Sequence, residues 1–138
     1  MGVYTPIFKI EENKMTITES IARINSLKPN SYSDIDKIRW LSELDGKIKS
    51  EVIDTHEGSE GVVFNGYDEN TIANATNLLV PSPYDNLYVL WLESKIDYYN
   101  GEYARYNNSS TAFNVAYLEF AKYYNRTHMP KAIKLKNF

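Results

Sequence analysis

The chain lacks several features that would place it in a well-defined class of protein. Its 138 residues include no cysteine, which excludes a disulfide scaffold, a thiolate zinc site and a cysteine nucleophile. Only six glycines and five prolines are present, too few for a collagen-like or low-complexity chain. No apolar run approaches the roughly 20 residues of a membrane span, and the N-terminus has no signal-peptide hydrophobic region. The sequence therefore predicts an intracellular, soluble protein.

The net charge of the chain is small, whereas tyrosine is abundant. The formal net charge is −3, which does not favour a chain that binds nucleic acid along its whole surface. Twelve tyrosines are present. Their apolar rings and polar tips suit subunit interfaces, but half-buried helix faces in a small domain account for them equally well.

Hydrophobic periodicity predicts an all-α fold, a small bundle of about four helices of which two are long and antiparallel. A capping box at Thr16 and Glu19 begins the first helix, which ends before Pro29. Ser33 begins a second helix that we expect to end near Gly58.

Two further helices are predicted in the C-terminal half. Ser82 and Pro83 form a helix-start signal, and the third helix is expected to contain Gly101 and to break at residues 107–110. The fourth is expected at about residues 111–125.

The domain organisation predicted from this pattern is one helical domain over residues 1–138. It has a flexible arm at residues 1–15, an insertion at 58–82 and an extended C-terminal arm at 129–138. The insertion is either irregular or holds a short hairpin at Asn65-Gly66, and Leu78-Leu79-Val80 reads as a short strand. The C-terminal arm alternates apolar and basic residues, as a strand does.

No motif for catalysis stands out. The nucleotide-binding and hydrolase glycine motifs are missing, and so is any histidine spacing typical of a metal site. His56 and His128 are far apart in the sequence, and we expect each to lie beside a helix C-terminus. We therefore expect no catalytic, cofactor-binding or metal-binding residues, and no enzyme.

Three stretches carry a resemblance to a known family. They are KIRWLSELDGKI at 37–48, PYD at 83–85 followed by YYNGEYARYNN at 98–108, and YYNRTHMP at 123–130. Together, over roughly residues 16–130, they resemble the head–tail connector proteins of long-tailed bacteriophages and prophages, which are also called adaptor or head-completion proteins.

The resemblance implies a structural protein of the phage neck, assembled in the host cytoplasm. Such a protein forms a homo-oligomeric ring of about twelve copies, docks on the portal protein after DNA packaging and extends the channel through which the DNA passes. The next neck component, a stopper or tail-completion protein, would bind its other side.

Two sets of residues are the expected contacts in such an assembly. The portal would be bound by the C-terminal arm, through Lys131, Ile133, Lys134, Leu135, Lys136 and Phe138. Neighbouring subunits would meet at Tyr88, Tyr99, Tyr103 and Tyr106. The alternative for the arm is packing against its own subunit.

Two other functions stay open from the sequence. One is a different small virion assembly protein, of the tail-completion or stopper type. The other is a small DNA-binding regulator, which would require a basic recognition helix. The predicted helices carry mixed charge, and lysine and arginine are concentrated after Arg126, so the regulator is the weaker alternative.

Overall fold

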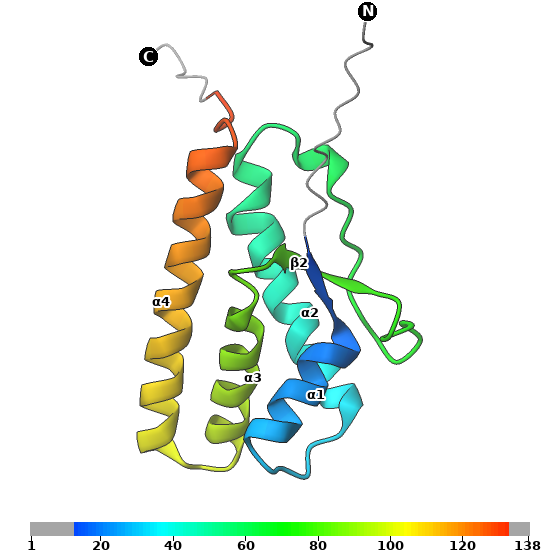
Figure 1. Ribbon diagram of the computed structural model, residues 1–138, viewed down its shortest axis with the longest axis vertical. Helices are drawn as coiled ribbons and strands as arrows, with labels where there is room; N and C mark the ends of the chain where they lie inside the picture. The colour runs from blue at the N-terminus through cyan, green and yellow to red at the C-terminus, as the bar shows by residue number, and fades with distance from the viewer. Residues whose placement is uncertain (1–12, 133–138) are drawn as a thin grey trace, which may run out of the picture.

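The computed structural model describes residues 13–132, and four α-helices dominate them (Figure 1). The helices are Ile17–Leu27 (α1), Asp34–Glu51 (α2), Asn86–Tyr99 (α3) and Tyr103–Thr127 (α4). Two short strands, Lys14–Thr16 (β1) and Asn77–Pro81 (β2), and two 3-10 turns, Ile53–Thr55 (η1) and Ser59–Gly61 (η2), complete the described part. The prediction of a mostly helical bundle is confirmed, with a small sheet added to it.

The first two helices begin where the sequence predicts. The hydroxyl of Thr16 accepts from the backbone N–H of Glu19 at 3.2 Å, and that of Ser33 accepts from Asp36 at 3.1 Å. Each cap satisfies an N–H group that has no partner inside its helix. The second helix ends at Glu51, earlier than predicted, and the chain continues into η1.

The third and fourth helices pack as an antiparallel pair, although the two longest helices are α2 with 18 residues and α4 with 25. The division between α3 and α4 also differs from the prediction. Gly101 has a φ of 73°, and the N–H groups of Gly101 and Glu102 close the end of α3 on the carbonyls of Tyr98 and Asp97. Gly101 is therefore the turn between two helices and not a kink within one.

The predicted break at residues 107–110 does not occur. Within α4 the hydroxyl of Ser109 donates to the Asp97 carboxylate at 2.8 Å, and the hydroxyl of Thr111 donates to the Asn107 carbonyl at 2.7 Å. These polar side chains find partners across the helix pair or within their own helix, so they do not end it.

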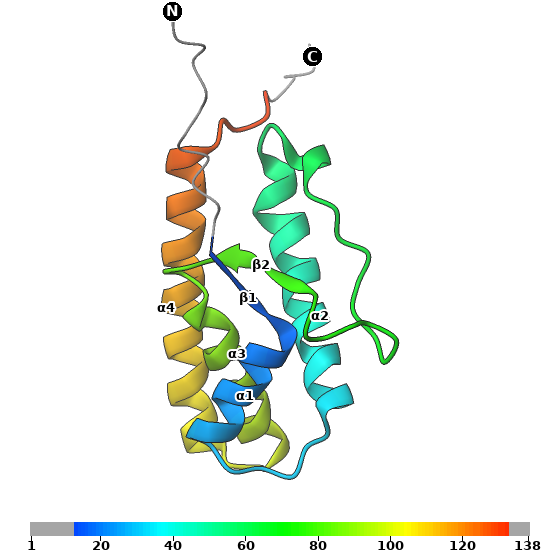
Figure 2. The same ribbon diagram turned by 45° about the vertical axis from the view of Figure 1, so that its right-hand side comes forward.

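The N-terminal segment and the insertion also differ from the prediction. Residues 14 and 15, expected to belong to a flexible arm, and the cap residue Thr16 form β1, which pairs with β2 in an antiparallel sheet that lies across the helices (Figure 2). The predicted strand at residues 78–80 is confirmed. The N–H of Ser82 donates to the carbonyl of Asn13 at 2.8 Å, so Ser82 extends the sheet contact and α3 begins later, at Asn86.

No hairpin forms at Asn65-Gly66. Gly66 has a φ of 86°, and the N–H of the following Tyr67 donates to the hydroxyl of Ser42 on α2 at 2.9 Å. The insertion is therefore held against α2 rather than against a second strand of its own.

A buried carboxylate joins these pieces. Asp45 on α2 is 0% exposed and accepts three hydrogen bonds. They come from the Tyr88 hydroxyl of α3 at 2.6 Å, the Leu79 N–H of β2 at 3.1 Å and the Tyr67 hydroxyl of the insertion. The Tyr88 hydroxyl in turn accepts from the N–H of Val80 at 2.8 Å. One side chain thus links a helix, a loop, a strand and a second helix.

Burial dominates the electrostatics of this group. It raises the pKa of Asp45 to about 6, although the three hydrogen bonds favour the charged form. Burial and the neighbouring carboxylate also raise the pKa values of Tyr67 and Tyr88, so both hydroxyls keep the protons that they donate.

Because the pKa of Asp45 is higher in the folded than in the unfolded chain, its stabilising contribution is complete below about pH 4 and is lost as the pH rises through about 6. The shift corresponds to about 3 kcal/mol.

Asp45→Asn removes this titration, so from pH 4 to pH 7 the free energy of unfolding of the variant should rise relative to that of wild type. Urea unfolding at both pH values measures this, with exposed Asp54→Asn as the control. A constant difference between wild type and Asp45→Asn would contradict the assignment.

Candidate interaction surfaces

The tyrosines that the sequence assigns to a subunit interface are divided by the fold. Tyr99 and Tyr103 are 55% and 64% exposed at the turn between α3 and α4, and Tyr106 lies close by. The ring of Tyr98, which is 50% exposed, joins them, with centroid distances of 5.2 Å to Tyr99 and 5.4 Å to Tyr106. We call these four residues the tyrosine surface.

Tyr88 does not belong to this surface, which corrects the prediction. It is 0% exposed and its hydroxyl is fully used by Asp45 and Val80. On a helix that is apolar on more than one face, the sequence pattern does not distinguish a core tyrosine from an interface tyrosine.

The tyrosine surface rests on a rigid aromatic base. Tyr99 stacks on Trp40 of α2 with a centroid distance of 5.5 Å and an interplanar angle of 8°. Tyr32 packs edge-on against Trp40 at 5.5 Å. A groove of about 350 Å³ opens beside this stack, lined by Tyr32, Asp36, Arg39, Trp40, Glu43 and Tyr99. Aromatic residues and arginine, which line this groove, are the types enriched in the cores of protein interfaces.

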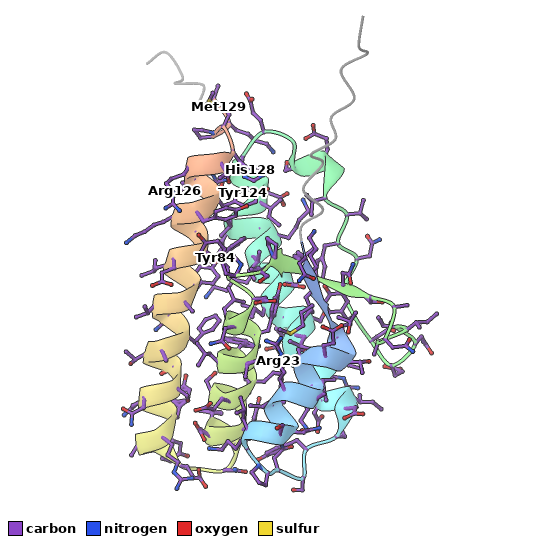
Figure 3. The ribbon with its side chains drawn as sticks, viewed as in Figure 1. Arg23, Tyr84, Tyr124, Arg126, His128 and Met129 are labelled. Atoms are coloured by element: carbon purple, nitrogen blue, oxygen red, sulfur yellow. The ribbon has the colours of Figure 1, made fainter. Side chains whose placement is uncertain are left out.

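The other end of the bundle brings the two histidines together, which the sequence did not predict. Their ring centroids are 6.4 Å apart, and His128 stacks on Tyr124 at 3.7 Å. His56 is 3% exposed, with Nδ1 at 2.6 Å from the carbonyl oxygen of Val52 and Nε2 at 2.8 Å from Oδ1 of Asn125. Figure 3 shows Tyr124, His128 and Met129 gathered at the end of α4.

This histidine cluster holds the first residues of the C-terminal arm. Pro130 forms an antiparallel bridge with His56, flanked by hydrogen bonds from the Glu57 N–H to the Met129 carbonyl at 2.8 Å and from the Lys131 N–H to the Thr55 carbonyl at 3.0 Å. Of the predicted portal contacts only Lys131 is described, and it is exposed. Ile133, Lys134, Leu135, Lys136 and Phe138 lie outside the described residues.

The outward face of α4 is a third surface. Val115 and Leu118 are 54% and 57% exposed there, with Ala104, Asn108 and Thr111 exposed on the same side. No charged residue occurs between Arg105 and Glu119. A long exposed face without charge is typical of a protein contact.

Between residues 13 and 132, no three histidine, aspartate or glutamate side chains lie close enough together to hold a metal ion. Within the same range no helix has the length and hydropathy needed to cross a membrane.

Comparison with known proteins identifies no relative. No family model, no curated protein and no solved structure matches the chain. Function must therefore be inferred from the chain itself.

The histidine cluster leads to a prediction about the arm. Asn125→Ala removes the protein partner of a buried ring nitrogen, which costs about 1 kcal/mol or more, and should loosen the bridge at Pro130. The amide of Lys131 should then exchange hydrogen about tenfold faster, as measured by NMR, while amides in the middle of α2 are unchanged. Asn114→Ala, an exposed change on the same helix, is the control. Equal exchange of Lys131 in the wild type and in Asn125→Ala would show that the arm is held by other contacts.

Proposed function

We propose that the protein is a structural adaptor of the phage neck, which forms a ring of about twelve copies on the portal and connects the head to the tail. The observation that carries the proposal is that one small bundle exposes two different surfaces rich in uncharged side chains, the tyrosine surface and the outward face of α4. A ring is built from heterologous contacts, in which two different surfaces of each subunit are used. The family resemblance of residues 16–130 supports a position for this ring in the neck of the virion.

The C-terminal arm is the portal-binding element of this proposal. Its root is fixed at Pro130 by the bridge to His56, so every subunit would present the following residues from the same point. The sequence after that point alternates apolar and basic side chains. Such a segment can add a strand to a partner and place Ile133, Leu135 and Phe138 in pockets, while Lys134 and Lys136 are drawn to an acidic portal surface.

The bridge at Pro130 determines where a truncation that tests the arm should begin. Deleting residues 133–138 removes no residue of the four helices or of the bridge at Pro130, since these all lie within residues 13–132. We expect an unchanged circular dichroism spectrum and thermal midpoint, together with loss of binding to purified portal in a pull-down assay. The control replaces residues 133–138 by a Gly-Ser segment of equal length. Full portal binding by the truncated protein would exclude the arm as the docking element.

A substitution that introduces a charge tests whether the tyrosine surface is a contact between subunits. Tyr103→Glu should prevent ring closure, because an unpaired charge enclosed in an interface costs several kcal/mol. Native mass spectrometry of portal mixed with adaptor should then count clearly fewer than the wild-type copies per portal. Val63→Glu places the same charge on another exposed residue, which is 73% exposed in the insertion, and should load like wild type. If Tyr103→Glu loads a complete ring, the tyrosine surface is not the subunit contact.

A further inference from the structure

The outward face of α4 has the geometry of a helix that is missing a partner. At 100° per residue, Ala104, Thr111, Val115 and Leu118 fall within an arc of roughly 60°. The arc lies opposite the buried side of the helix, which carries Phe113 and Phe120 at 4% and 1% exposure. The spacing along this face alternates steps of four and three residues, as it does where two helices pack along a shared line of contact. We call the five residues with this spacing the seam: 104, 108, 111, 115 and 118.

The two halves of this seam differ in bulk, and the difference favours one orientation. The N-terminal half carries the smaller Ala104, Asn108 and Thr111, whereas the C-terminal half carries the bulkier Val115 and Leu118. In a parallel pair of identical helices, bulky residues would meet bulky ones and small would meet small. In an antiparallel pair the bulky half of each helix faces the small half of the other, so the seam can close along its whole length.

The charges at the ends of the seam have the same two-fold pattern. Arg105 and Glu119 lie seven residues on either side of Ala112 and on the same flank of the seam. When two antiparallel copies cross at Ala112, each Arg105 lies level with Glu119 of the second copy, and residues on the same flank face each other. The side chain of Arg105 is 71% exposed, and its nearest ion-pair partner is Glu102 at 3.4 Å. Glu119 makes no ion pair with any residue between 13 and 132.

From this complementarity of shape and charge, we propose that the free protein pairs with a second copy of itself through antiparallel contact of the two α4 helices. The contact is two-fold symmetric and contains two Arg105–Glu119 ion pairs. In Figures 1 and 2 α4 forms one edge of the bundle, and the other helices lie on its opposite side. The second copy can therefore approach the seam without meeting the rest of the fold.

The pairing stands independently of the neck function. If the chain is a neck adaptor, the pair covers one of the two surfaces that a ring would use, so free chains are kept from closing rings until the portal competes with the second copy. The seam is short and has only two flanking ion pairs, so we expect a weak, reversible dimer that forms at micromolar concentrations.

The test is a charge exchange. Sedimentation velocity over a concentration series should show wild type passing from the 16.0 kDa monomer to a dimer. Arg105→Glu alone and Glu119→Arg alone each turn both ion pairs into like-charge pairs and should raise the dissociation constant about tenfold. The double variant R105E/E119R restores opposite charges and should return it to near the wild-type value. Arg23→Glu, an exposed change on α1, should have no effect, and circular dichroism checks that each variant is folded.

Three results would overturn the pairing: wild type that stays monomeric, single variants that dimerise like wild type, or a double variant that is as weak as the single ones. An oligomer larger than a dimer that responds to Tyr103→Glu but not to the charge reversals would instead assign self-association to the tyrosine surface and contradict the α4 pair. Ring loading on the portal is measured separately, so loss of the dimer with intact loading would leave the proposed neck function standing.

Discussion

The carboxylate of Asp45 is the constraint on which the arrangement of the bundle depends. An acceptor buried this deeply must have its hydrogen bonds supplied from several directions, and here they come from the insertion, from β2 and from Tyr88 of α3. Each donor fixes its own element relative to α2. The small sheet and the start of α3 are placed in this way, and the α3–α4 pair follows from the placement of α3.

A second buried carboxylate does the same at the far end of α3. Asp97 is 1% exposed, forms an ion pair with Lys28 at the end of α1 and accepts from Ser109 of α4. The turn that presents the tyrosine surface lies directly beyond these contacts. The proposed interaction surfaces therefore stand on rigid elements, as an assembly contact requires if it is to form without a large cost in ordering.

The sequence predicted those features that depend on neighbours along the chain. The caps at Thr16 and Ser33 each join residues three apart, so local pattern was sufficient. Long-range pairing was missed, because nothing local marks residues 14–16 as the partner of β2, or Tyr88 as the partner of a residue 43 positions away. The histidine cluster and the continuous α4 were missed for the same reason. The sequence pattern places Tyr99, Tyr103 and Tyr106 on one continuous helix, whereas the fold brings them together at the turn between α3 and α4.

Imaging tests most directly the proposal that this chain builds a ring on a portal. Negative-stain electron microscopy of the purified protein mixed with the purified portal should show an additional annular layer, of about twelve-fold symmetry and with an open central channel, on one side of the portal. Portal particles that carry no added layer at saturating protein concentration, or carry it without rotational symmetry, would contradict the account.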